Sequence, residues 1–281
     1  MRLGFHISIA GGLPQVILRA LKNRCEVIQI FSRNPRSWKN SSLNPEGIKS
    51  FQRALSQTSI SPVFLHTPYL LNLASPKEEL YTRSINYLRE ELQRAHRLGA
   101  QFVIVHVGNR LNIKEEKALE RVSRAINLTL DKVRNSVQLL LENTAGQGTE
   151  IGYKFSQLQS ILNQLEDKKR IGICLDIAHA FEAGYDLSNS KGLDQMLEEF
   201  DTLIGLSKLK VLHLNDSRTR FGSRVDRHWH IGEGEIGLSA FRNIVNHPAL
   251  SHLPGIMETP RKTDADDMRN MEVMKSLISS H

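Results

Sequence analysis

Eight short runs of β-branched and apolar residues recur along the chain, and segments with helical spacing lie between most of them. Apolar residues in Leu80–Leu98 and Val122–Val133, for example, repeat every three to four positions, as on one face of a helix. Alternating strands and helices are typical of parallel sheets. The candidate strands are Leu3–Ile7, Val27–Phe31, Val63–Leu65, Phe102–Val107, Val137–Leu141, Ile171–Leu175, Val211–Leu214 and Gly255–Met257.

This pattern favours an α/β fold of the (β/α)8 TIM-barrel type, with residues 1–281 forming a single domain. Such barrels occupy about 250 residues as one unit. An open, doubly wound sheet is the structural alternative. It is disfavoured because the turn Ala10-Gly11-Gly12 after the first strand lacks the G-x-G-x-x-G pattern.

Composition indicates a soluble chain with a polyanionic partner. The formal charge of +7 and the sequence pI of about 9.5 favour a polyanion such as nucleic acid. Two cysteines, Cys25 and Cys174, suggest neither a disulfide framework nor a thiolate metal site, which fits a cytoplasmic location. Because no export signal or long apolar run is visible, we expect no membrane partner. We also expect a monomer with no obligate protein partner.

The predicted strands end in one chemical type of residue. In a barrel the carboxyl ends of all strands meet at one mouth, so these side chains converge there. Any one histidine at a strand end is more often a hydrogen-bonded core residue than a ligand. Six such groups together are costly to bury without a cation, and imidazole with carboxylate suits zinc, manganese or iron. They are His66, His106, Glu142, Asp176, His213 and Glu258.

A second group follows these strands. His179 lies three positions after Asp176, and Asp226 and His228 share one side of an extended segment in the long connection Asn215–Ile236. These three residues could complete another metal site. We interpret His230 as a loop imidazole. No role is assigned to the remaining histidines, His6, His96, His247, His252 and His281.

Several long motifs, in order along nearly the whole chain, resemble the endonuclease IV family. They are Gly4–Gly12, His66–Leu73, Leu141–Gly148, Asp176–Asp186, Leu212–Gly234 and Glu258–Pro260. The chain departs from the usual family pattern at Asn109, at Ile177-Ala178 and at Ser37, but no departure removes a ligand.

The resemblance implies a TIM-barrel DNA-repair enzyme with three divalent ions, usually zinc, with manganese or iron possible at one site. His66 and His106 would hold one ion, which Glu142 would bridge to a second held by Asp176, His213 and Glu258. His179, Asp226 and His228 would hold the third. The implied reaction is hydrolysis of the phosphodiester 5′ to an abasic site in double-stranded DNA, and 3′-blocked lesions are possible further substrates. Glu142 would be the catalytic bridge.

Candidate DNA-binding residues lie in loops at the expected mouth. Tyr69 and Leu70 could fill the gap left by a missing base, and Arg36 could enter the stack from the loop after the second strand. Arg33 and Arg224 could contact phosphate. Trp38 could equally be a packed anchor of its loop.

Two other functions remain open from the residues alone. A metal-dependent sugar isomerase or epimerase could use the same barrel, but it would need fewer ligands and no third site. A non-catalytic DNA-binding protein with structural zinc is the other alternative, although structural zinc is normally closed by four ligands.

Overall fold

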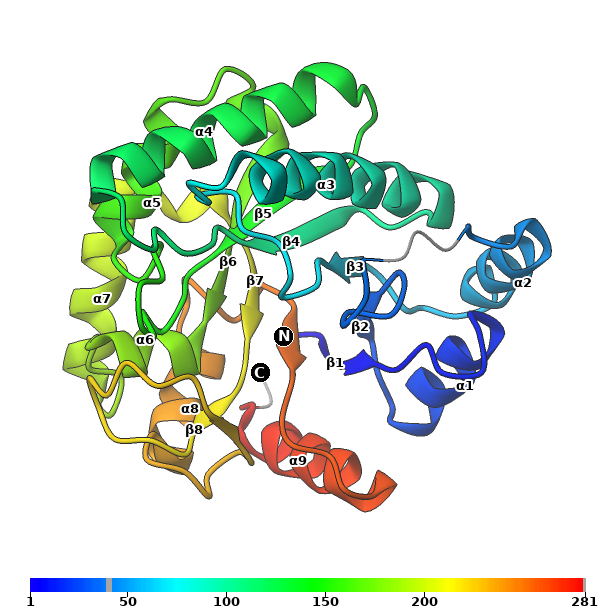
Figure 1. Ribbon diagram of the computed structural model, residues 1–281. Coiled ribbons are helices and arrows are strands. Elements are labelled where there is room, and N and C mark those ends of the chain that lie inside the picture. The colour runs from blue at the N-terminus through cyan, green and yellow to red at the C-terminus, as the bar shows by residue number, and fades with distance from the viewer. Residues whose placement is uncertain (39–41, 280–281) are drawn as a thin grey trace.

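The computed structural model describes residues 1–38 and 42–279 and forms a closed barrel of eight parallel strands surrounded by helices (Figure 1). The strands pair in the order β1-β10-β7-β6-β5-β4-β3-β2, and β1 closes the ring against β2. The (β/α)8 prediction is therefore confirmed. The barrel strands are β1 (Leu3–Ile7), β2 (Val27–Phe31), β3 (Val63–His66), β4 (Phe102–His106), β5 (Gln138–Glu142), β6 (Ile171–Asp176), β7 (Leu209–His213) and β10 (Gly255–Met257).

Helices follow the strands and cover the outside of the barrel (Figure 1). The two segments predicted from their apolar spacing are helical, although the second begins seven residues earlier than expected, at Glu115 rather than Val122. The helices are α1 (Pro14–Lys22), α2 (Pro45–Ser56), α3 (Glu78–Leu98), α4 (Glu115–Lys132), α5 (Phe155–Asn163), α6 (Ile177–Ala183), α7 (Ser190–Leu203), α8 (Gly237–Asn246) and α9 (Asp264–Leu277), with short 3-10 turns η1 (Lys168–Arg170) and η2 (Leu206–Lys208).

Apolar side chains form two layers. A small cluster within the barrel contains residues from seven strands, and a much larger one lies between the strands and the helices. The strands are thus buried on both faces, which explains why their sequences are nearly continuous apolar runs. The inner cluster consists of Val27, Phe64, Ile104, Leu140, Cys174, Val211 and Ile256.

Two long connections lie between these elements, Ser32–Asn44 between β2 and α2, and Asn215–Ile236 between β7 and α8. Residues 39–41 of the Ser32–Asn44 connection lie outside the described residues. The Asn215–Ile236 connection contains a short antiparallel pair, β8 (Asp216–Ser217) with β9 (His228–Trp229). This pairing turns the chain back on itself beside the carboxyl end of β7.

Within residues 1–38 and 42–279, no helix combines the length and the apolar character needed to cross a membrane.

Candidate metal centre

Strand register brings the predicted ligands together at one end of the barrel. His106 on β4 pairs with Glu142 on β5, and Asp176 on β6 pairs with His213 on β7. Since neighbouring strands lie about 4.8 Å apart, side chains at paired positions that point the same way come into contact. The ring of strands therefore determines which ligands are neighbours.

The first group of ligands surrounds one oxygen of Glu142. Nε2 of His66 lies 2.9 Å from Glu142 Oε2, and Nε2 of His106 lies 3.1 Å from the same atom. Glu142 and His66 are buried, whereas one third of the His106 side chain is exposed. His106 therefore forms the accessible edge of this group.

The second group shares Glu142 with the first. Nδ1 of His213 lies 3.0 Å from Glu142 Oε1, 3.4 Å from Glu258 Oε2 and 3.6 Å from Asp176 Oδ2. One ligand atom from each of these four residues can be chosen so that all lie within 4.8 Å of one another. Glu142 thus has one oxygen directed at each group, as a bridging carboxylate requires.

Cys174 also lies within 4.8 Å of Glu142 and His213, although the sequence suggested no thiolate site. Burial raises the pKa of this thiol, and Glu142 raises it further. The residue belongs to the apolar layer inside the barrel. A neutral thiol beneath the centre fits the structure better than a thiolate ligand.

The third group forms just beyond the strand ends. Asp176 caps the first turn of α6 by accepting a hydrogen bond from the His179 backbone N–H at 2.8 Å, which places His179 over the mouth. The β8–β9 pair brings His228 to it, with 3.2 Å between the two Nε2 atoms. Asp226 Oδ1 lies 3.5 Å from His179 Nε2 and 3.7 Å from His228 Nε2.

Asp176 joins this third group as well, since its Oδ2 lies 3.5 Å from His228 Nε2. The sequence placed Asp176 only in the second group. The carboxylate lies between the two groups, and this position depends on the fold of the long connection.

The spacing and chemistry of these atoms fit divalent cations. Two ligands about 2.0–2.1 Å from a tetrahedral zinc ion are about 3.3–3.4 Å apart. Several ligand atoms lie at about this separation, including the paired Nε2 atoms of His179 and His228 at 3.2 Å. Neutral imidazole and carboxylate are ligands for zinc, manganese and iron. The residues present therefore suit a metal centre.

Backbone carbonyls orient two of the imidazoles. His66 Nδ1 lies 2.6 Å from the Thr67 carbonyl oxygen, and His179 Nδ1 lies 2.9 Å from that of Asn143. Each carbonyl can only accept, so each Nδ1 carries the hydrogen. The opposite nitrogen of each ring then faces the cluster with a free lone pair, as a metal ligand requires.

Sequence reasoning missed several residues that support the ligands. Asn215 donates to Asp176 Oδ2 at 2.8 Å and accepts from the Glu258 N–H at 2.7 Å. The sequence assigned no role to His6. Its Nδ1 lies 3.1 Å from Glu258 Oε1, so His6 lies beside the candidate ligands. The position of His6 near the carboxyl end of the first strand was the available signal. For Asn215 the signal was its place directly after the seventh strand.

The centre opens into a cavity of about 370 Å³. His66, His106, His179, Asp226, His228 and Glu258 are among its lining residues, together with Tyr69 at the rim. The ligands thus face a space that a small part of a larger molecule could enter.

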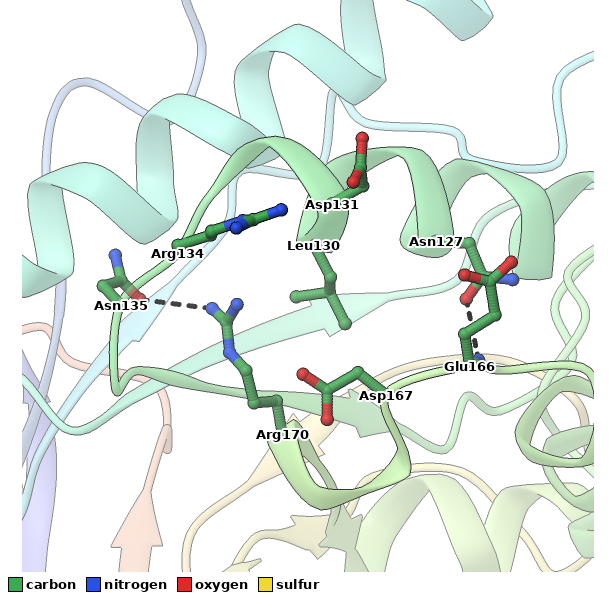
Figure 2. Close-up of a pocket in the computed structure, with 8 residues that line it drawn as sticks. All are labelled: Asn127, Leu130, Asp131, Arg134, Asn135, Glu166, Asp167 and Arg170. Atoms are coloured by element: carbon green, nitrogen blue, oxygen red, sulfur yellow. Dashed lines mark hydrogen bonds between the residues drawn. The ribbon is translucent and has the colours of Figure 1, made fainter.

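A larger groove of about 540 Å³ lies at the other end of the barrel and is lined by residues that precede β5 and β6 (Figure 2). Arg170 donates to Asn135 Oδ1 at 3.2 Å, and the Glu166 N–H donates to Asn127 Oδ1 at 3.1 Å. Its charged groups are of mixed sign, and none belongs to a candidate metal group within the described residues. The candidate metal ligands lie at the opposite end of the barrel.

Within the centre, the charged form of each buried group is stabilised by neighbours of opposite charge. Burial disfavours the charge of Glu142, but His106 and His213 hold the pKa of this carboxyl well below its usual range. Burial likewise opposes protonation of His179, yet Asp176 and Asp226 raise its pKa well above the usual value. The pKa of His213 is also raised despite burial. Protons and cations therefore compete for the same imidazoles.

The candidate DNA-binding residues occupy different environments. Tyr69 is 72% exposed, Arg36 and Arg224 are exposed, and Leu70 is half-buried. These four residues remain available for contact with a ligand.

Arg33 requires a correction. Its side chain is only 2% exposed, with Nε 2.8 Å from Glu91 Oε1 and Nη1 2.8 Å from Glu90 Oε2. The guanidinium also lies over the ring of Tyr87. The burial of Arg33 and its two carboxylate partners argue against the expected phosphate contact, and they indicate that Arg33 holds its loop against α3.

Three other unexplained positions have structural partners. Trp38 packs edge-on against Tyr87, which supports its interpretation as a loop anchor. The backbone of Asn109 is held at both its N–H and its carbonyl by the Asn72 side chain, at 3.0 and 2.9 Å. His230 is buried with Nδ1 3.1 Å from Asn270 Nδ2, as expected for a structural imidazole.

Comparisons with known proteins agree with this architecture. Residues 18–277 match the family described as xylose isomerase-like TIM barrel. The chain is 44% identical to a probable endonuclease 4 from Halothermothrix orenii, covering 95% of this chain and 96% of the relative. It is also 44% identical to a probable endonuclease 4 from Methanoculleus marisnigri, covering 99% of each.

Solved structures share the fold, and one of them is an endonuclease IV. Endonuclease IV from Thermus thermophilus superposes with a TM-score of 0.87 and 34% identity, covering 99% of this chain and 98% of that one. A D-tagatose 3-epimerase-like protein superposes with a TM-score of 0.72 at 18% identity, covering 99% and 97%, which shows the fold alone.

Fold and site together define a xylose isomerase-like TIM barrel with a candidate metal centre at the carboxyl ends of its strands. Within this class, relatives of 44% identity over nearly the full chain decide the family. The chain belongs to the endonuclease IV family.

Competition between protons and cations predicts how metal binding depends on pH. Because His179 and His213 have a raised pKa, each must lose a proton before it can act as a ligand. We expect affinity for zinc to fall as the pH decreases from about 8 to about 6, by up to tenfold per pH unit for each proton displaced. Titration calorimetry in buffers of different ionisation enthalpy should detect proton release. Affinity that is flat across this range, without proton release, would contradict the assignment.

Proposed function

We propose that this protein is a DNA-repair endonuclease that hydrolyses the phosphodiester 5′ to abasic sites in duplex DNA, leaving a 3′-hydroxyl and a 5′-deoxyribose phosphate. The observation that carries the proposal is the set of three adjoining ligand groups facing one cavity. The names of the similar proteins support endonuclease activity. The +7 charge of the chain suits a polyanionic substrate.

The ligand sets would hold three divalent ions, most simply zinc, with manganese or iron possible at one site. Bound there, the ions would supply a nucleophilic hydroxide at neutral pH and offset charge on the phosphate. Three divalent ions against the four carboxylates Glu142, Asp176, Asp226 and Glu258 leave a net charge of about +2, which attracts a phosphodiester.

The side chains of the protein provide position rather than proton transfer. Glu142 lies between two groups and holds their spacing constant, because its carboxylate is buried and contacts three imidazoles. The partly exposed edge formed by His106, His228 and Asp226 leaves room for the substrate. Geometry held before the substrate arrives lowers the barrier, since less reorganisation is needed during reaction.

Two alternatives fit less well. A sugar isomerase or epimerase shares the barrel, but it has no evident use for the third group formed by His179 and His228. A structural zinc site would be closed by its ligands, whereas these groups border a cavity of about 370 Å³. Incision of an abasic duplex, measured together with metal content, separates the three functions.

We also propose a substrate, an oligomeric state and a location for the protein. The substrate would be double-stranded DNA with abasic or 3′-blocked lesions, bound by a monomer without an obligate protein partner. Both cysteines are free and buried, as suits a protein of the reducing cytoplasm.

Glu142→Gln is expected to abolish turnover while leaving DNA binding largely intact. An amide is neutral and a poorer ligand, so the spacing of two ions would be lost, whereas Glu142 is too deeply buried to contact DNA. Single-turnover incision and binding to abasic duplex measure the two effects. Activity within about tenfold of the wild type, a barrier change near 1.4 kcal/mol, would refute the bridging role.

His228→Ala is expected to lower metal content from about three equivalents to about two. His228 contributes a ligand only to the third group, so the ions associated with Glu142 should remain. Atomic emission on the purified protein counts the ions, and thorough chelation should stop incision of the wild type. Fully active protein with only one or two ions would show that the third site is wrongly assigned.

The rim residues suggest how a missing base would be found. Tyr69 is well exposed beside the cavity, and Arg36 is exposed on the loop after β2. A side chain inserted into the duplex costs least where stacking is already broken. We infer that these two residues, with Leu70, act as a wedge that selects abasic DNA.

Tyr69→Ala and Arg36→Ala should each weaken binding to abasic duplex more than binding to intact duplex. Loss of a stacking side chain should cost roughly 1–3 kcal/mol. Arg224→Ala is the matched control, because loss of an exposed phosphate contact should weaken both duplexes alike and lower the salt slope by about one. Paired salt titrations measure this, and equal losses on both DNAs for Tyr69→Ala would eliminate the wedge.

A further inference from the structure

We propose that Gln29 is a positioning residue of the metal centre that orients His213 and Glu258 together. Gln29 lies in the middle of β2, and its side chain is completely buried. Its Oε1 lies 2.8 Å from His213 Nε2, and its Nε2 lies 2.5 Å from Glu258 Oε1. One neutral amide thus contacts two ligands of the same group, which come from β7 and the end of β10.

The neighbouring carboxylate determines which way this amide points. A carboxylate that binds a cation is ionised and can only accept a hydrogen bond, and Glu258 Oε1 lies 2.5 Å from Gln29 Nε2. A carbonyl oxygen at that position would repel the carboxylate. The amide nitrogen therefore faces Glu258, and the amide oxygen faces His213.

This orientation selects the tautomer of His213. An amide oxygen only accepts, so the hydrogen of the ring must be on Nε2. Nδ1 is then left to the ligand cluster, 3.0 Å from Glu142 Oε1 and 3.4 Å from Glu258 Oε2. A histidine ligand fixed in this way binds metal more tightly because neither ring orientation nor tautomer has to change.

His6 Nδ1 lies 2.8 Å from Gln29 Nε2 and 3.1 Å from Glu258 Oε1, so the amide also contacts the imidazole that lies beside Glu258. A carboxylate at this position would lose the amide donor to Glu258 and add negative charge next to it. A neutral amide therefore suits both His213 and Glu258.

This inference rests on the metal centre of the proposed function, but it can be tested whether or not the protein cuts DNA. In Gln29→Met, which keeps side-chain length and burial, we expect one ion to bind roughly 10–100-fold more weakly and the other ions to bind as in the wild type. Competition between the metal-free protein and a chelator, with Co²⁺ or Zn²⁺ as the probe, measures each affinity.

The matched control is Gln157→Met. Gln157 is also buried, but it lies on α5 and accepts its hydrogen bond from the Gly152 N–H, at 2.8 Å, rather than from a candidate metal ligand. It should leave all metal affinities unchanged even if stability falls. A decrease shared by both variants would show that general loosening of the fold, rather than Gln29, is responsible.

The wild type provides a second test that needs no variant. In ¹⁵N spectra of the zinc-loaded protein, His213 should carry its hydrogen on Nε2, protected from exchange, with Nδ1 bound to metal. A hydrogen on Nδ1, or equal metal affinities in Gln29→Met and wild type, would overturn the inference while leaving the proposed function intact. A folded wild type that binds no divalent cation would overturn the metal centre and this inference together.

Discussion

Four carboxylates and five imidazoles meet at one end of the barrel, and the rest of the structure depends on the balance between them. An unpaired buried charge costs several kcal/mol, so none of these carboxylates could be buried in its ionised form without partners. Glu142 shows the balance most clearly, because its carboxylate is fully buried and within 3.1 Å of three imidazoles. Hydrogen bonding between parallel strands sets these distances, and a rigid barrel maintains them.

The third ligand group is held differently, because it lies on a long connection rather than on strands. Asp216 has a buried carboxylate that accepts hydrogen bonds from the backbone of Gly232, Gly234 and Ile236. Glu182 on α6 likewise accepts from Ser217 Oγ and from the Arg227 N–H. Two buried acids thus organise the segment that carries Asp226 and His228, so backbone hydrogen bonds take the place of an apolar core.

Buried charge also supports the rim on the opposite side of the cavity. Glu91 on α3 accepts hydrogen bonds from Arg33 Nε at 2.8 Å and from Ser32 Oγ at 2.7 Å, and Arg94 donates to Ser32 Oγ at 2.6 Å. This network ties the start of the loop after β2 to the outer layer of helices. Arg36, three residues beyond Arg33, consequently emerges from an anchored base. Rigid support beneath an exposed tip suits the proposed insertion of Arg36 into a duplex.

The sequence by itself determined the alternation of strands and helices, the barrel, and the six polar residues at strand ends. Strands of a buried parallel sheet are apolar runs, so a polar residue that follows such a run shows where the strand ends. The tertiary structure decided which polar residues are buried and which partners they have. Arg33 was predicted to contact phosphate but contacts Glu91, 58 positions away. Gln29, to which the sequence assigned no role, contacts His213, 184 positions away. The local sequence pattern shows the period of a strand or helix. Partners far apart in the sequence come into contact only when the barrel closes.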